Sequence, residues 1–267
     1  MAVRKINEST LTAIGNAIRS KTGGSALINP EDMASEIDSI QTGGSSIANG
    51  IEIVDYYANG KIKEINAVGN VPPSFMQYWW YNSSPVKVNL VSNPTHIGDS
   101  AFNAAFVELD NSYLEGVETA DSWAFVVAVN GTNNLSSKTL SLPSFTGGGS
   151  SNSTSRFRSQ ATQFYGNYYL PKMQEVHDYD WYQNKVANVS IQIGSIGNPL
   201  QTCGNYPFGG ASGSGTITVY TTGSLLDGLR TKLQQNAGAN YSFVYKASEN
   251  TEYGGVSYQA GDTMLTS

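Results

Sequence analysis

Four short stretches with a shared pattern recur along the chain and constrain its fold more than any other feature. In each, a residue suited to an inward position is followed by small or polar turn formers and then by a bulky aromatic. The stretches are residues 97–102 (IGDSAF), 117–125 (VETADSWAF), 176–182 (VHDYDWY) and, less clearly, 203–208 (CGNYPF). A unit this short cannot bury an apolar face alone, so the recurrence predicts a solenoid whose stacked neighbours build the core between them.

An extended apolar segment lies near each of these stretches. The segments are residues 87–90, 106–109, 139–142, 188–191 and 216–219. A strand followed by a turn with one aromatic, repeating every roughly 20–30 residues, is the pattern of a β-solenoid. Residues 147–155 (GGGSSNSTS) interrupt the repeats, and their small polar composition predicts a mobile insertion loop.

Three segments carry resemblances to known families. Residues 97–102 resemble the repeat consensus of the BspA-type leucine-rich repeats found in bacterial surface and bacteriophage proteins. Residues 216–227 resemble the strand and helix that close such arrays. Residues 11–23 and 30–37 are similar to a helical module that begins many structural proteins of phages of Gram-positive hosts. The resemblance implies a tail- or fibre-like bacteriophage virion protein: mainly β, with a short N-terminal helical hairpin and an irregular leucine-rich-repeat-like β-solenoid body.

The first forty residues predict this helical hairpin independently of any resemblance. Apolar residues recur at helical spacing in two segments, and Asn29 followed by Pro30 is a strong helix start. Two helices this short cannot bury both stripes on each other, so we expect them to dock on another particle protein or a second copy; packing on the chain's own body is the alternative. The docking residues are Leu11, Ile14, Ile18, Met33, Ile37 and Ile40.

Four regions follow from composition and pattern. Residues 1–46 are the attachment module with its Gly/Ser linker, and residues 47–84 hold a β-hairpin over about 51–66 and an aromatic cap. The repeat body covers 85–222. Residues 223–267 add a helix over 224–235, a strand over 241–245 and an irregular hairpin.

Composition excludes several functions. Charged residues are 13% of the chain and the net charge is -6, which argues against nucleic acid, whose binding requires clustered Lys and Arg. The one cysteine, Cys203, permits no internal disulfide. The longest apolar run, residues 124–129, is far shorter than the ~20 residues that cross a bilayer. With no signal-peptide pattern either, we expect synthesis in the host cytoplasm, no membrane partner and release inside a virion.

Aromatic clusters are the candidate ligand-binding residues. The densest cluster, residues 78–81, is interpreted as a lid over the first coil, as a platform that stacks on sugar rings, or as a trimer contact. A second set lies in the third repeat. Together they are Tyr78, Trp79, Trp80, Tyr81, Tyr168, Tyr169, Trp181 and Tyr182.

Catalytic patterns are weak. His96 and His177 lack metal-site spacing, and a pairing of Cys203 with His177 is formally possible. Asp178 and Asp180 resemble the carboxylate pair of a glycosidase, but acidic residues in a turn are usually solvated. A cation site at Asp99, Asp121 and Asp178 is conceivable. We therefore expect no catalytic residue, no metal site and no cofactor.

Three functions remain open. The one we expect is a particle-anchored accessory fibre or adhesin that binds a host wall glycan or surface protein. The second is a purely architectural capsid, neck or tail component, and the third is a glycan-cleaving tail enzyme. We expect a homo-oligomer, a trimer, that contacts other virion proteins through residues 1–46, because several weak glycan contacts bind strongly when presented together.

Overall fold

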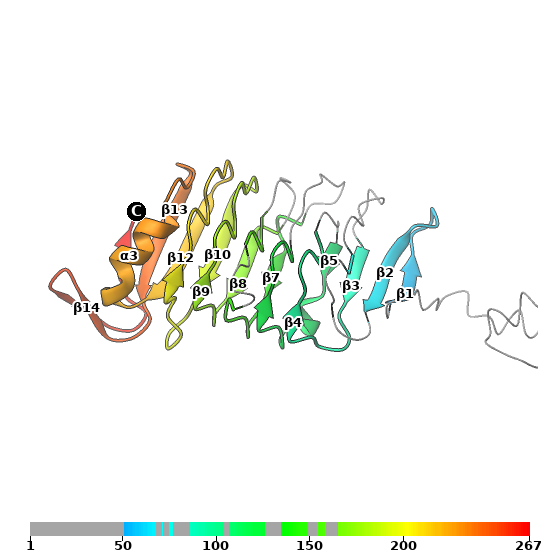
Figure 1. The fold of residues 1–267 in the computed structure, drawn as a ribbon, viewed down its shortest axis with the longest axis horizontal. Coiled ribbons are helices and arrows are strands. Elements are labelled where there is room, and N and C mark those ends of the chain that lie inside the picture. The colour runs from blue at the N-terminus through cyan, green and yellow to red at the C-terminus, as the bar shows by residue number, and fades with distance from the viewer. Residues whose placement is uncertain are drawn as a thin grey trace, which may run out of the picture.

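The chain folds as an elongated stack of coils (Figure 1). The computed structural model describes residues 51–67, 71, 75–76, 86–103, 107–125, 135–148, 154–158 and 165–267. These residues form a mainly β solenoid of about six turns, which confirms the predicted β-solenoid body. Within the described part, no helix is long and apolar enough to cross a membrane.

One wall of the solenoid is a long sheet that receives one strand from each coil. It is divided into a four-stranded sheet, in the order β1-β2-β3-β5, and a six-stranded sheet, in the order β16-β13-β12-β10-β8-β7. Pairing is parallel between coils and antiparallel only at the two ends, for β1 with β2 and for β13 with β16. The strands are β1 (Ile51–Tyr56), β2 (Ile62–Ala67), β3 (Val86–Asn89), β5 (Val107–Leu109), β7 (Thr139–Ser141), β8 (Asn167–Leu170), β10 (Val189–Ile193), β12 (Gly215–Thr221), β13 (Tyr241–Ala247) and β16 (Thr263–Thr266).

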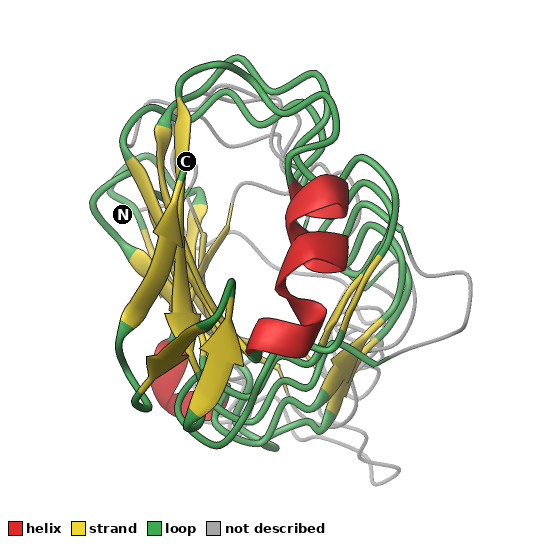
Figure 2. Ribbon diagram, turned by 90° about the vertical axis from the view of Figure 1, so that its left-hand side faces the viewer, coloured by secondary structure: helices red, strands yellow, loops and turns green. Residues whose placement is uncertain are grey.

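The opposite wall consists of turns and very short parallel strands, as the end-on view in Figure 2 shows. Its strands are β4 (His96–Ile97), which pairs with β6 (Thr119–Ala120), and β9 (Glu175–Val176), which pairs with β11 (Thr202–Cys203). In the long sheet, side chains alternate between the interior and solvent: Ile217 and Val219 of β12 are buried, while Thr216 is exposed. This period of two is why short β-branched segments suit the coils.

A column of stacked aromatic rings runs through the interior between the two walls. Phe102 stacks on Phe125 at 6.3 Å between ring centroids, Phe125 on Phe157 at 5.5 Å, Phe157 on Trp181 at 4.9 Å and Trp181 on Phe208 at 5.1 Å. The planes of these successive pairs differ by 18°, 2°, 17° and 6°. Each coil therefore contributes one residue, which we call its ladder residue. Phe102 and Phe125, which end the first two recurring stretches of the sequence, thus stack inside the solenoid.

The structure corrects the prediction of a mobile loop at the end of residues 147–155, of which residues 149–153 lie outside the described part. Phe157 is a fifth ladder residue, and the main-chain N–H of Phe157 donates to the carbonyl of Asp180 at 2.9 Å. Ser155 is buried, and its N–H donates to the carbonyl of Asp178 at 3.0 Å. The end of the expected mobile loop is thus part of a regular coil, because inter-coil main-chain hydrogen bonds require no particular side chain there.

A seam separates the two parts of the long sheet, between β5 and β7, and side chains bridge it. The carboxamide of Asn111, in a 3₁₀ turn (Asn111–Tyr113), donates to the carbonyl of Thr139 at 2.8 Å and accepts the N–H of Ser141 at 3.0 Å. The hydroxyl of Tyr165 accepts the N–H of Leu109 at 2.8 Å. Asn111 thereby takes the place of a strand residue opposite β7. A pocket of about 260 Å³ opens at the seam.

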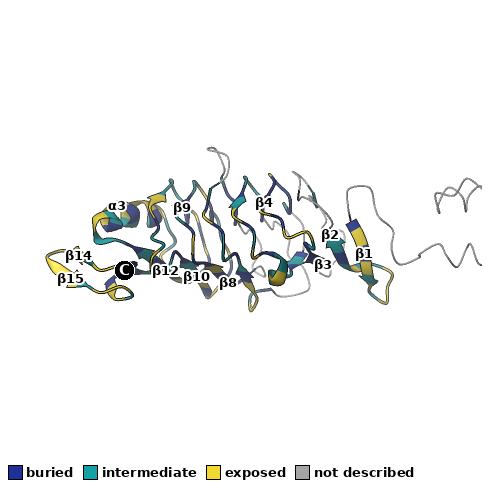
Figure 3. Ribbon diagram, turned by 90° about the horizontal axis from the view of Figure 1, so that it is seen from below, coloured by how far each residue is buried: buried dark blue, intermediate teal, exposed yellow. Residues whose placement is uncertain are grey.

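Both ends of the solenoid are closed by additional elements, whose exposed residues stand out in Figure 3. The antiparallel hairpin of β1 and β2 lies at the N-terminal end, as predicted for residues 51–66. At the C-terminal end, helix α3 (Gly223–Leu233) buries Leu226, Leu229 and Leu233, as predicted for residues 224–235. The hairpin of β14 (Thr251–Tyr253) and β15 (Val256–Tyr258) follows it. The predicted docking residues in 1–46 and the aromatic residues 78–81 lie outside the described residues.

Candidate functional site

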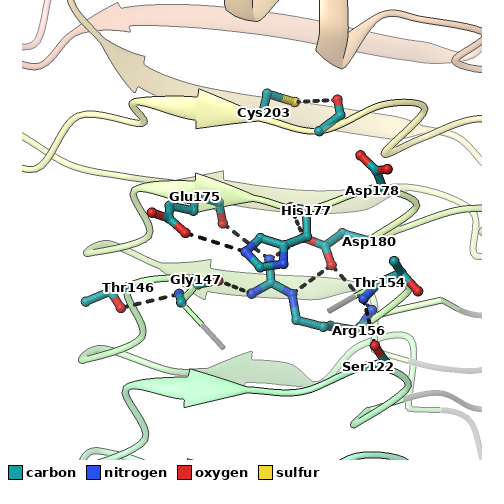
Figure 4. Close-up of polar contacts among 12 residues, drawn as sticks. Ser122, Thr146, Gly147, Thr154, Arg156, Glu175, His177, Asp178, Asp180 and Cys203 are labelled. Atoms are coloured by element: carbon teal, nitrogen blue, oxygen red, sulfur yellow. Dashed lines mark hydrogen bonds and ion pairs between the residues drawn. The ribbon is translucent and has the colours of Figure 1, made fainter. Parts of the chain in front are cut away.

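Of the residues with catalytic character, Asp180 and His177 belong to a polar cluster around the buried side chain of Arg156, whereas Cys203 lies apart from it (Figure 4). The side chains of Arg156 and Asp180 are completely buried and form an ion pair, with 2.5 Å between Nη2 and Oδ2 and 2.8 Å between Nε and Oδ1. Arg156 also donates to the carbonyls of Gly147 and Glu175. The prediction that the Asp178–Asp180 turn is solvated is therefore wrong for Asp180, whose carboxylate links two coils.

Of the other polar contacts in this region, the one between Asp178 and Asn205 joins two coils, and the other two are local. Asp180 accepts the main-chain N–H of His177 at 2.8 Å, and Asp178 accepts that of Asn205 at 2.5 Å. The Cys203 thiol donates to the carbonyl of Gly204, and burial raises the pKa of this thiol. A buried thiol with a raised pKa is a poor nucleophile, because the thiolate is the reactive form.

The three aspartates considered for a cation site have separate partners. Asp99 accepts a hydrogen bond from Ser100, and Asp121 pairs with His96 at 3.1 Å. Across the described ranges, no three His, Cys, Asp or Glu side chains are grouped so that they could hold a metal ion.

Two of the predicted ligand-binding aromatics face the interior. Trp181 is 0% exposed and Tyr168 is 2% exposed, so neither can contact a ligand from outside, which corrects the prediction. Trp181 is a ladder residue, and Tyr168 occupies an inward position of β8 next to it, at 6.1 Å between ring centroids. Tyr169, the next residue of β8, points outward and is 43% exposed, and Tyr182 is half-buried.

A group of aromatic side chains lies around Tyr182, on the wall that consists of turns and short strands. We define the aromatic surface as Trp123, Arg158, Tyr179, Tyr182 and Tyr206, which come from four consecutive coils. The rings of Tyr179 and Tyr206 are parallel to within 10° at 6.0 Å, and Tyr179 meets Tyr182 edge-on at 5.1 Å. The guanidinium of Arg158 lies 5.2 Å from the centroid of Trp123 and 5.4 Å from that of Tyr182. The arginine therefore connects the tryptophan to the tyrosines.

The main chain beneath this surface has an unusual conformation. Trp123, Tyr179 and Tyr206 each stand two residues before a ladder residue and have φ values of 59°, 61° and 51°. A left-handed conformation costs an L-residue roughly 1–2 kcal/mol and is uncommon for bulky side chains. Ser100 and Ser155 occupy the equivalent positions of the other coils with the same sign of φ. The coil geometry thus imposes this conformation, and three coils place an aromatic residue where a small or flexible one would fit with less strain.

Glycines allow the rings to lie close to the backbone of the next coil. A Cβ atom at Gly209 would come within 2.9 Å of Cβ of Tyr206 and 3.4 Å of the Tyr182 ring. A Cβ at Gly204 would lie 2.3 Å from the carboxylate of Asp178, next to Tyr179. A side chain at Gly209 would displace the tyrosines and one at Gly204 would displace Asp178, so the surface depends on the backbone around it.

Comparisons with known protein families, with curated proteins and with solved structures find no match for this chain. Its function must therefore be inferred from its own residues.

Proposed function

We propose that this chain is a particle-anchored adhesin of a bacteriophage virion that binds a host surface glycan through the aromatic surface. The observation that carries the proposal is the aromatic residue at the left-handed position of three coils, namely Trp123, Tyr179 and Tyr206, with Tyr179 at 36% exposure. The coil geometry imposes this backbone in every coil, but a bulky ring there is less favourable than the serines of the other two coils, which supports a role in binding rather than in stability. Electron-rich ring faces attract the C–H groups of pyranose rings, and partly exposed tyrosines supply such faces with little loss of side-chain entropy.

The virion part of the proposal rests on the resemblance of residues 11–23 and 30–37 to a phage helical module. In this proposal the N-terminal helical hairpin anchors the chain on the particle, and a trimer presents several copies of the aromatic surface. Repetition along a rigid solenoid suits this role, since a stack of coils holds residues of different coils at fixed spacing.

The test is binding of the purified chain to cell-wall glycan of the host. Replacing both Tyr179 and Tyr206 with Asn removes the two parallel rings but keeps a residue type that tolerates a left-handed backbone. We expect this variant to remain folded and to lose binding, whereas Tyr179→Phe, which keeps the ring, should bind nearly as well as the native chain.

Tyr169→Asn is the matched control, because Tyr169 is exposed on the long sheet and lies outside the aromatic surface. It should leave binding unchanged. If Tyr169→Asn lost binding and the double variant at Tyr179 and Tyr206 kept it, the ligand would bind on the long sheet. That result would contradict the proposal.

A further inference from the structure

Within the described ranges of the chain, Arg158 is a cation that forms no ion pair. The ion pairs among the described residues join other cations to carboxylates, and none of them includes Arg158. Its guanidinium donates to the side-chain oxygen of Gln183, and its Nε atom is buried with no hydrogen-bond partner. Arg156, two residues earlier, shows the contrasting case, since its charge is balanced by Asp180.

The surroundings of Arg158 make this unbalanced charge costly. Burial lowers the pKa of its guanidinium, which means that the charged form is partly desolvated. The rings of Trp123 and Tyr182 compensate in part, because the face of an aromatic ring attracts a cation. They also hold the planar group in place, so that little freedom remains to be lost when an anion binds.

We propose that Arg158 binds an oxyanion carried by the glycan, either a carboxylate or a phosphate group, while the neighbouring rings contact the sugar. A guanidinium matches both groups geometrically, because its N–H donors form paired hydrogen bonds with two oxygens of the same anion. This inference rests on the proposed function and adds the class of ligand: an acidic rather than a neutral glycan.

The experiment measures binding of the full chain to three immobilised polymers: a uronic acid polymer, a poly(glycerol phosphate) and a neutral glucan. The native chain should prefer at least one acidic polymer, and the two acidic arms distinguish carboxylate from phosphate. Arg158→Gln should weaken that binding by about tenfold or more, the range expected for a lost charged hydrogen bond. Arg158→Lys keeps the charge but not the planar guanidinium, so its affinity for the acidic polymer should lie between those of the native chain and Arg158→Gln.

Lys138→Gln is the control for net charge, because Lys138 is paired with Glu108 at 3.0 Å in the long sheet. It should bind like the native chain. Binding to the acidic polymer should also weaken as salt rises from about 0.05 M to about 0.5 M, since ions screen the attraction. This salt series tests the inference even if Arg158→Gln proves unstable.

The outcomes separate the two proposals. Equal binding of acidic and neutral polymers, unaffected by Arg158→Gln, would overturn the role of Arg158 and leave the glycan adhesin intact. Failure of the native chain to bind any polymer or host glycan would overturn both. If Lys138→Gln weakens binding to the acidic polymer as much as Arg158→Gln does, the effect is one of net charge, and the inference is overturned as well.

Discussion

Replacing Asp180 with Asn should destabilise the solenoid by about 3–5 kcal/mol, the usual cost of leaving one member of a buried ion pair without its partner. Asn keeps the shape of Asp and removes its charge, so the completely buried Arg156 loses its counter-ion. The carboxylate also accepts main-chain hydrogen bonds from His177 at 2.8 Å and Arg156 at 3.3 Å. An amide has one acceptor oxygen in place of two, so at least one of these donors is weakened as well.

Urea unfolding followed by tryptophan fluorescence measures this loss. Trp181, adjacent to Asp180 in the chain, stacks between Phe157 and Phe208, so its emission should change when these coils separate. Since domains are stable by about 5–15 kcal/mol, a loss of 3–5 kcal/mol is readily detected. Equal m-values for native chain and variant would show that the same surface unfolds in both.

A double-mutant cycle decides whether the ion pair is the cause. Arg156→Met alone should also destabilise, partly because the carbonyls of Gly147 and Glu175 lose a donor. Because each single change leaves a buried charge and the double change leaves none, the double variant should be about 1–3 kcal/mol more stable than the sum of the single losses predicts. Additive losses, or a loss below about 1 kcal/mol for Asp180→Asn, would refute the reasoning.

Three further predictions concern the ladder, the buried tyrosines and the anchor. Phe157→Ala should cost about 3–5 kcal/mol, as expected for a buried Phe, and a loss below about 1 kcal/mol in urea unfolding would show that Phe157 is not a ladder residue. Burial raises the pKa of Tyr241 to about 12 and that of Tyr168 well above its ordinary value, so the unfolded chain releases these protons first, at pH about 10. The free energy of unfolding should therefore be unaffected by these groups below pH 10 and fall as pH rises toward 12, with a smaller fall in Tyr168→Phe; a flat profile would contradict this. A chain that begins near Ser45 should fold and remain soluble but fail to join virions, and normal incorporation would disprove anchoring by residues 1–46.

The ladder and the two ends could be predicted from the sequence because their signals are local. Phe102 and Phe125 follow a turn of small and acidic residues, and the hairpin and helix follow ordinary turn and helix patterns. Phe157 was missed because it follows a Gly/Ser-rich segment with Arg156 in place of the small or acidic residue. Tyr168 and Trp181 were assigned to the surface because an aromatic residue has the same apolar character on either wall, and only the register decides which way it points.

The aromatic surface was only partly predictable, through Tyr182. Once Phe125, Trp181 and Phe208 are recognised as ladder residues, the residue two positions before each is Trp123, Tyr179 or Tyr206. That spacing alone would have grouped the three residues. It would not have shown their left-handed backbone or the location of Arg158 between Trp123 and Tyr182, since both depend on how successive coils stack.

The ladder residues also explain why Arg156 and Arg158 have opposite environments. The residue just before each ladder residue is buried in every repeat from Phe102 to Phe208, and the column contains Ala101, Ala124, Arg156, Asp180 and Pro207. Arg156 and Asp180 are thus neighbours in one column, and their opposite charges match only when these two coils are in register. A shift of one residue in the coil of Phe157 would place Phe157 or Ser155 opposite Asp180 and leave its charge buried and unpaired, which is strongly unfavourable. The shift that places Phe157 there would also move Arg158 inward to the ladder position, so the ion pair that fixes the register also keeps Arg158 at the surface, where an anion can reach it.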